Sequence, residues 1–277
     1  MSVGSPLRVV VVSNGNAFST TMIRPLVEDP SVDVAGALIV SVPSGRGGSL
    51  ATLWRLTRRT GVRFATYKAL SLAVPAIAGR RWQVPVFLRD LCRSRGVPAR
   101  SVRSVNGRDA AEFLRGAAPD VIVSVSTPER ILPEVLGLAR IAPLNVHWAL
   151  LPAYGGIAPY VWVLRNGERR TGVTVHVMNE RLDTGPILRQ RPVEITRDDT
   201  ALSLQLRLAS VAAEELHAAV RALPESLATA TEQPSGGRSY YTWPHRSDVR
   251  AMRRRGRRLA RSRDLRAMWR EARALRD

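Results

Sequence analysis

The sequence has almost no lysine and almost no cysteine. Lys68 is the only lysine among 42 basic residues, and Cys92 is the only cysteine in 277 residues. A single cysteine excludes internal disulfides and cysteine-cluster metal sites, and it fits the reducing cytoplasm. We therefore expect a cytoplasmic protein with no bound metal.

Long apolar runs are absent as well. The longest, ALSLAVPAIAG at residues 69–79, contains a proline and is shorter than the roughly 20 residues that a membrane-spanning helix needs. No basic region precedes the apolar run LRVVVVS at residues 7–13, so this run predicts a β-strand and not a signal peptide. Hydrophobic residues make up 45% of the chain, which is ordinary for a folded protein.

Acidic residues are too few to balance the arginines, and the formal net charge is +19. Residues 246–277 hold 13 arginines against 4 acidic residues, a net of +9, which leaves +10 for the other 245 residues. Apolar residues recur in this segment at helical spacing around Gly256, so it predicts a basic helical tail. A solvated helix packed on the domain is the commonest meaning of such a tail. RNA or an anionic membrane surface stays open as a partner of residues 246–277, but neither is favoured.

The order of the apolar segments predicts an α/β fold. Strands at residues 7–13 and 32–40 flank a helix at about residues 20–28, which forms a βαβ unit with parallel strands. We expect a Rossmann-like, mostly parallel sheet with helices on its faces. Further predicted elements are a strand at 120–125, a strand carrying Asn145 and His147, a helix at 158–168, a hairpin of 171–178 with 185–195, and a long helix capped by Asp199 or Thr200.

Polar side chains from separate segments can meet at one edge of this sheet. Asn145 and His147 are two residues apart on a strand, so their side chains share a face. An irregular segment, ALLPAYGG, follows them, and Asp183 lies in the loop of the later hairpin. Ligand sites of open α/β sheets lie at the carboxyl ends of the strands, so we expect the functional site there.

These residues match a known family. The segment LNVHWALLPAYGGIAPYVWVLRNGERRTGVTVHVMNERLDTGPIL, residues 144–188, resembles the core of the formyltransferases that use 10-formyltetrahydrofolate. That family includes methionyl-tRNA formyltransferase, glycinamide ribonucleotide transformylase and the sugar N-formyltransferases. The Asn-x-His element, the Thr-Gly-Val-Thr-x-His strand and the Leu-Asp-x-Gly-Pro-Ile loop occur in the family's order. Trp148 and Ala149 stand where Pro and Ser are usual.

The resemblance extends more loosely over about residues 7–223 and implies a division of the chain. Residues 1–223 would form the catalytic domain, with a poorly matched, basic and helical insertion at about residues 44–84. Residues 224–245 would be a linker with the aromatic cluster YYTWP, and residues 246–277 the Arg-rich helical tail.

The resemblance also implies roles for three residues. Formyl transfer to an amine passes through a tetrahedral intermediate, whose oxyanion the amide of Asn145 would stabilise. His147 would donate to the same oxygen or relay the proton of the amine. Asp183, as a carboxylate, would orient the imidazole and draw that proton off. The amine attacks directly, so no nucleophilic serine or cysteine is needed.

Binding residues follow from the same resemblance. The folate would lie in an apolar pocket whose backbone groups would recognise the pterin. Apolar residues at helical spacing are also common in a protein core, so core packing is the alternative for them. The candidates for this pocket are Phe87, Leu88, Leu91, Val125, Leu182, Asp183, Gly185 and Pro186. The amine acceptor would contact His176, or the turn formed by Asn14, Gly15 and Asn16, where N–H groups near a helix start suit an anion. His176 could equally satisfy a buried hydrogen bond.

The expected acceptor is a small amine, such as an amino sugar, a nucleotide or a specialised-metabolite amine. A methionyl-tRNA formyltransferase-like enzyme is the first alternative, favoured by the charge, although such enzymes carry a C-terminal β-barrel and this sequence predicts a basic helix there. A formyltetrahydrofolate hydrolase is the second alternative. The third is a non-catalytic module on this scaffold that binds nucleic acid or membrane. The oligomeric state stays open.

Overall fold

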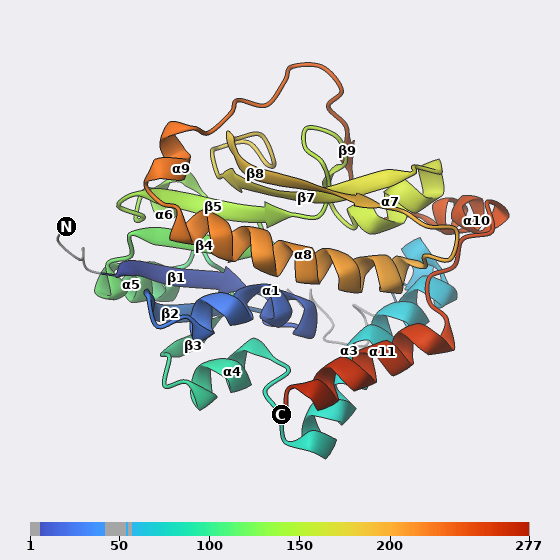
Figure 1. The fold of residues 1–277 in the computed structure, drawn as a ribbon, viewed down its shortest axis with the longest axis horizontal. Coiled ribbons are helices and arrows are strands. Elements are labelled where there is room, and N and C mark those ends of the chain that lie inside the picture. The colour runs from blue at the N-terminus through green and yellow to red at the C-terminus, as the bar shows by residue number, and fades with distance from the viewer. Residues whose placement is uncertain (1–5, 42–53, 55–56, 277) are drawn as a thin grey trace.

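The computed structural model describes residues 6–41, 54 and 57–276, and its centre is a seven-stranded sheet in the order β3-β2-β1-β4-β5-β7-β8. Strands β3, β2, β1, β4 and β5 are parallel, whereas β7 and β8 run antiparallel at one edge (Figure 1). This arrangement confirms the predicted mostly parallel sheet. The strands are β1 (Leu7–Ser13), β2 (Val32–Val40), β3 (Ala99–Val102), β4 (Val121–Val125), β5 (Ala142–His147), β7 (Arg170–Val177) and β8 (Ile187–Glu194).

Strand β1 shows why the sheet forms the core. Val9, Val10, Val11 and Val12 have no exposed surface, because helices cover both faces of a parallel sheet and every position on a central strand is then buried. Val9 and Val11 belong to one apolar cluster, and Val10 and Val12 belong to a second cluster on the other face.

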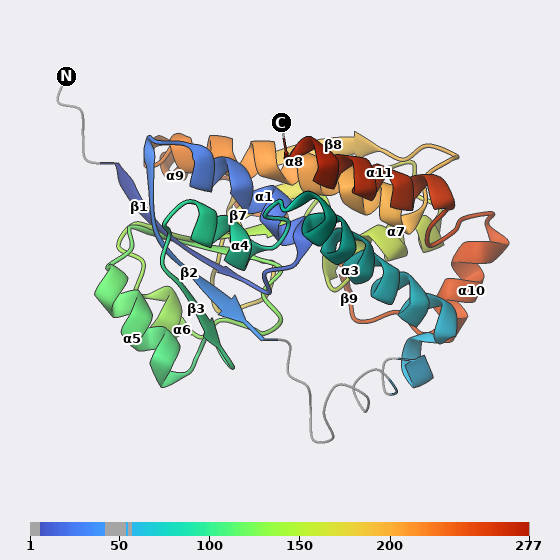
Figure 2. The same cartoon turned by 90° about the horizontal axis from the view of Figure 1, so that it is seen from below.

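Two layers of helices cover these faces (Figure 2). Helices α1 (Ala17–Glu28) and α8 (Ala201–Arg221) lie on one face, and α5 (Arg108–Ala117) and α6 (Pro133–Leu136) lie on the other. Thr200 caps α8, as predicted, and its side chain accepts the N–H of Ser203 in a capping box.

The predicted basic insertion is helical where the structure describes it. Helix α3 (Val62–Trp82) accounts for most of it, and α4 (Leu88–Ser94) follows; residues 42–53 and 55–56 of the insertion lie outside the described residues. Helix α3 packs beside α11 (Ser262–Ala274) (Figures 1 and 2). The rings of Trp82 and Trp269 make an edge contact, with their centroids 6.2 Å apart.

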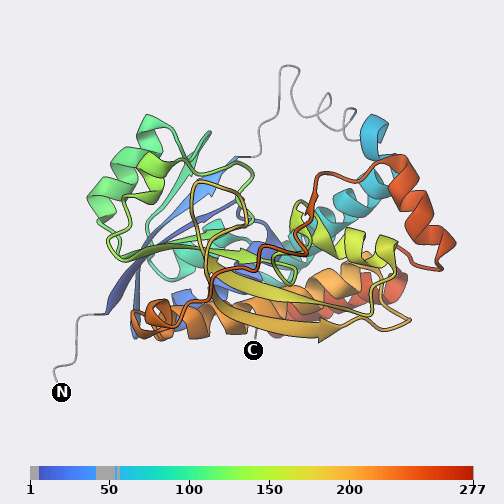
Figure 3. The same cartoon turned by 90° about the horizontal axis from the view of Figure 1, so that it is seen from above.

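The C-terminal segment is helical, as predicted, and Gly256 lies in the break between its two helices. These are α10 (Arg246–Arg254) and α11. Before them, the chain runs from α9 (Glu225–Ala228) across the molecule to α10 (Figure 3). On this path β9 (Tyr240–Tyr241) pairs in parallel with β6 (Gly155–Gly156), next to α7 (Pro159–Asn166). The division of the chain at residues 223 and 245 stays a prediction.

None of the helices among the described residues has both the length and the apolar character that crossing a membrane requires.

Candidate active site

Strand pairing brings a second histidine to the predicted pair. Strand β7 runs antiparallel to β5 and sets His176 opposite Asn145 and Thr174 opposite His147. Nδ2 of Asn145 lies 3.1 Å from Nε2 of His176, whose Nδ1 lies 2.9 Å from the carbonyl oxygen of Val177. A carbonyl can only accept, so Nδ1 carries the proton and Nε2 accepts from Asn145. Burial lowers the pKa of His176, against the charge of Asp183, and so favours this neutral ring.

His147 is oriented by the loop that follows its strand. Its Nε2 lies 2.8 Å from the carbonyl oxygen of Tyr154 and therefore donates to it. In the neutral ring Nδ1 is then an acceptor, and it lies 3.7 Å from Oδ1 of Asp183. Oδ1 is also 3.8 Å from Nε2 of His176. These acceptor atoms make no direct hydrogen bond with one another, and a donor that bonds to two of them would lie beside the pair.

Asp183 is held in place through several contacts of its loop. Its Oδ2 accepts the N–H of Gly156 at 2.7 Å, and its backbone has a left-handed φ of 55°. The side-chain amide of Gln233 donates to the carbonyl oxygens of Asp183 and Gly185 at 3.1 and 2.9 Å. A Cβ atom on Gly185 would lie 1.9 Å from the carbonyl oxygen of Val177, so only glycine fits. The carboxylate is therefore presented from a constrained loop.

Trp148 and Ala149, the two departures from the family pattern, both pack in the protein interior. Trp148 points into the core, where its Nε1 lies 3.0 Å from the sulfur of Met22 and its ring packs edge-on against Phe18. Ala149 is fully buried, and its carbonyl oxygen accepts the hydroxyl of Thr174 at 2.7 Å. The loop is thus tied to β7 without a serine hydroxyl at position 149.

A tyrosine pair from the C-terminal segment borders this site. Gly155 donates its N–H to the carbonyl oxygen of Ser239, and Ile157 donates to that of Tyr241 at 2.7 Å. Tyr240 is 52% exposed, and burial together with the charge of Asp183 raises its pKa. Tyr240 and Asp183 both border Gly155, since a Cβ atom there would lie 3.4 Å from Cδ2 of Tyr240 and 3.5 Å from Oδ2 of Asp183. The cluster YYTWP is visible in the sequence, but nothing in the local pattern connects it to the Gly-Gly turn. Sequence reasoning also missed Gln233 and Tyr154.

The predicted folate residues fall into two groups. Side chains of Leu88, Leu91 and Val125 have no exposed surface, so only their backbone could contact a ligand without rearrangement of the core. The partly or largely accessible residues are Phe87, Leu182, Asp183 and Pro186, whereas Gly185 is buried. All of these folate contacts stay predictions.

Several polar groups of the predicted acceptor turn are already hydrogen-bonded to other groups of the protein. Asn16 caps α1 by accepting the N–H of Ser19, and Asn14 accepts the N–H of Asn16 at 3.1 Å. Gly15 donates to Ser13 at 3.0 Å, while its carbonyl oxygen accepts the N–H of Leu88. The turn therefore adjoins the predicted folate segment, whereas His176 lies with Asn145. A role for either in acceptor binding stays a prediction.

Within the described ranges, no group of three or more His, Cys, Asp and Glu side chains could hold a metal ion. The side chains that meet in the candidate site are one amide, two imidazoles and one carboxyl group.

Comparison with known proteins places this chain in a family. The family described as formyl transferase matches residues 79–220, just over half of the chain. The methionyl-tRNA formyltransferase of Anaeromyxobacter dehalogenans (strain 2CP-1 / ATCC BAA-258) is 41% identical over 149 residues, which cover 54% of this chain and 47% of that protein. The methionyl-tRNA formyltransferase of Thermotoga maritima is 38% identical over 132 residues, or 48% and 42% of the two chains. The chain thus spans about half the length of the curated relatives it matches.

Solved structures show the same fold. A sugar N-formyltransferase from Shewanella sp FDAARGOS_354 superposes with a TM-score of 0.55 at 20% identity, over 88% of this chain and 79% of that one. Glycinamide ribonucleotide transformylase 1 from Symbiobacterium toebii gives 0.57 at 20% identity, over 80% and 89%. At this identity the likeness shows the fold alone. With the family match over half of its length, the chain belongs to the formyl transferase family.

Proposed function

We propose that this protein transfers a formyl group from 10-formyltetrahydrofolate to a primary amine. The observation that supports this most strongly is the meeting of Asn145, His147 and Asp183, which come from a strand and from a distant loop. The group offers one amide donor and acceptors for a proton, and it needs no metal or nucleophilic side chain. Such a set fits attack by an amine on an activated formyl carbon.

Each residue has a distinct task in this proposal. The bound folate would supply the formyl group on a nitrogen that can leave. Asn145 uses one amide N–H on His176, and its second N–H is available to the carbonyl oxygen of the formyl group as negative charge develops there. His147 and Asp183 take the proton that the amine loses as the new C–N bond forms, and this proton returns to the departing folate nitrogen as the old C–N bond breaks.

The names of the curated relatives favour methionyl-tRNA as the acceptor over the small amine expected from the sequence. Identity of about 40% in the shared region, against named methionyl-tRNA formyltransferases, supports an aminoacyl-tRNA amine as the first candidate. The match covers only about half of those proteins. Acceptor contacts that lie in their other half therefore give no support for an acceptor of this chain.

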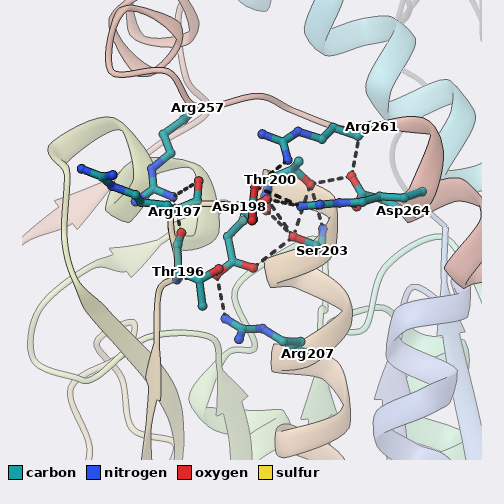
Figure 4. A network of polar contacts seen from close by, with 11 residues as sticks. Thr196, Arg197, Asp198, Thr200, Ser203, Arg207, Arg257, Arg261 and Asp264 are labelled. Carbon is teal, nitrogen blue, oxygen red and sulfur yellow. Dashed lines mark hydrogen bonds and ion pairs between the residues drawn. The ribbon is translucent and has the colours of Figure 1, made fainter.

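A small amine is the second candidate, because some arginines of the tail already have partners within the chain. Arg261 pairs with Asp198 at 3.0 Å, Arg263 bonds the carbonyl oxygen of the same residue at 2.5 Å, and Arg257 bonds the carbonyl oxygens of Thr196 and Arg197 (Figure 4). Not all 13 arginines of the tail are therefore free to contact RNA.

Release of tetrahydrofolate tests the function and separates the candidates. The full chain is incubated with 10-formyltetrahydrofolate alone, with methionyl-tRNA, and with a panel of small amines. Release that depends on an acceptor is expected, fastest with methionyl-tRNA. Release without any acceptor would identify a hydrolase, and no release under any condition would overturn the proposal.

A further inference from the structure

A cavity of about 490 Å³ lies between α3 and the chain that joins α10 to α11. Its volume is in the range of small-molecule sites, about 300–1,000 Å³. None of its lining residues belongs to the candidate active site. The lining consists of Val62, Arg63, Thr66, Tyr67, Leu70, Arg253, Gly256, Arg257, Arg258, Leu259 and Ala260.

The residues that line this cavity carry an unbalanced positive charge. Four arginines line it and no acidic residue does. Arg257 is engaged by the carbonyl oxygens of Thr196 and Arg197. Among the residues that the structure describes, no carboxylate pairs with the side chain of Arg63, Arg253 or Arg258. Arginines that line one cavity without an acidic residue attract an anion, and phosphate suits the fork of N–H donors of a guanidinium group.

The same cavity exposes apolar surface. Val62 is 68% exposed and Leu70 is 38% exposed, and both lie on its wall beside the buried residues Tyr67 and Leu259. The hydroxyl of Tyr67 donates to Gln205 at 2.6 Å, which fixes the position of the ring. A ligand that covers this wall needs an apolar or aromatic part as well as a charge.

The wall formed by residues 257–259 is anchored to the start of α8. The backbone N–H groups of Ala201 and Leu202 donate to the carbonyl oxygens of Arg258 and Leu259 at 3.0 and 2.9 Å. Behind them, the hydroxyl of Thr200 donates to the buried Asp264 at 2.8 Å (Figure 4). The backbone of the cavity wall is therefore set before any ligand binds, which lowers the entropy cost of binding.

We propose that this cavity binds a small organic phosphate of nucleotide type. Its phosphates lie against Arg63, Arg253 and Arg258, and its base or other flat apolar part covers Val62 and Leu70. This site is separate from the residues proposed for formyl transfer, so its occupancy does not depend on that activity.

Calorimetric titration of the full chain, without folate, tests the proposal. The probes are ADP, which carries both chemical parts, and pyrophosphate and adenosine, which each carry one. ADP is expected to bind at least about tenfold more tightly than pyrophosphate, and adenosine is expected to bind weakest. Absence of ADP binding at millimolar concentration would overturn the proposal, as would equal affinity for ADP and pyrophosphate.

Matched variants locate the site. The double variant Arg253→Gln/Arg258→Gln is expected to weaken ADP binding by about tenfold or more, since hydrogen bonds between two charged groups are among the stronger ones in proteins. The control Arg250→Gln/Arg266→Gln removes two exposed arginines of α10 and α11 that do not line the cavity, and it should change ADP binding by less than about twofold. Leu70→Gln should weaken ADP and leave pyrophosphate unchanged.

Two results would contradict the assignment. Equal losses in the two double variants would show a diffuse basic surface in place of a site. Displacement of ADP by single-stranded RNA, with loss of RNA binding in the Arg253→Gln/Arg258→Gln variant, would assign the cavity to a nucleic-acid surface instead of a small ligand.

Discussion

The candidate active site and the basic helical region of α3, α10 and α11 use polar side chains in opposite ways. Around Asn145 and Asp183, a few polar groups are buried or nearly buried, and each is oriented by a short contact with backbone or with a neighbouring strand. In the basic region many arginines lie at the surface, and among the described residues only some of them have an ion-pair or hydrogen-bond partner. The positions and contacts of the polar side chains identify the candidate active site, whereas charge alone does not identify a function for the basic region.

The largest effect is expected when Asp183 becomes asparagine. The variant keeps an oxygen that can accept the N–H of Gly156 but loses the negative charge that would draw off the proton of the amine. Formyl transfer should fall by about 10²–10⁴-fold, measured as initial rate, with an unchanged melting temperature.

The matched control is Asp198→Asn in the basic region. Asp198 is 74% exposed and pairs with Arg261 and Arg263, so its loss should leave the rate within about twofold. Equal rates for wild type and the Asp183→Asn variant would remove Asp183 from the mechanism.

Asn145→Ala should have the next largest effect. It removes the donor proposed for the developing oxyanion, and loss of one such donor costs about 10²–10³ in kcat. The measurement is kcat and KM for the acceptor. A rise in KM with unchanged kcat would instead assign Asn145 to binding.

Gly185→Ala breaks the loop that presents Asp183. The new Cβ would lie 1.9 Å from the carbonyl oxygen of Val177, and such overpacking costs about 1–3 kcal/mol or more. Urea denaturation measures the loss of stability, and activity should fall with it. Gly236→Ala is the control, because no heavy atom lies within 4 Å of the place its methyl group would take and its φ is outside the left-handed region; its stability should not change.

Asp264→Ala tests the anchoring of the basic region. Asp264 is buried and accepts from the hydroxyl of Thr200 and the N–H of Arg261 at 2.8 and 2.6 Å. Its loss should lower the free energy of unfolding by about 1–3 kcal/mol without changing kcat. The exposed Asp198→Ala should cost less than about 1 kcal/mol. If kcat falls although the variant is fully folded under the assay conditions, the basic region and the candidate active site are coupled.

The smallest effect concerns pH. Burial lowers the pKa of His176 below its ordinary value of 6.5, so the unfolded chain takes up this proton before the folded chain does. His176 therefore contributes stability that is present above pH 6.5 and is lost as pH falls through its folded pKa. Urea denaturation between pH 7 and pH 5 should show a shallower loss of stability in His176→Gln than in wild type. Parallel curves would argue against a buried, neutral His176.

Local sequence pattern was enough to predict strands β1, β2, β4 and β5, the hairpin of β7 and β8, the cap of α8 at Thr200, and the position of Asn145 and His147 on one strand. It could not predict that His176 lies opposite Asn145, because this depends on the order and direction of strands in the sheet. Nor could it pair Tyr240 with Gly155 or predict that Gln233 donates to the carbonyl oxygen of Asp183, because those contacts join segments that are distant in the chain. The burial of Trp148 likewise depends on its neighbours in the core.

The central claim is that His147 acts with Asn145 and Asp183 on a formyl group. The most direct measurement is the transfer of a labelled formyl group from 10-formyltetrahydrofolate to the best acceptor by wild type and by His147→Gln. Wild type should label the acceptor, and the variant should do so at least about a hundredfold more slowly with the same melting temperature. Labelling by the variant at the wild-type rate would contradict the account.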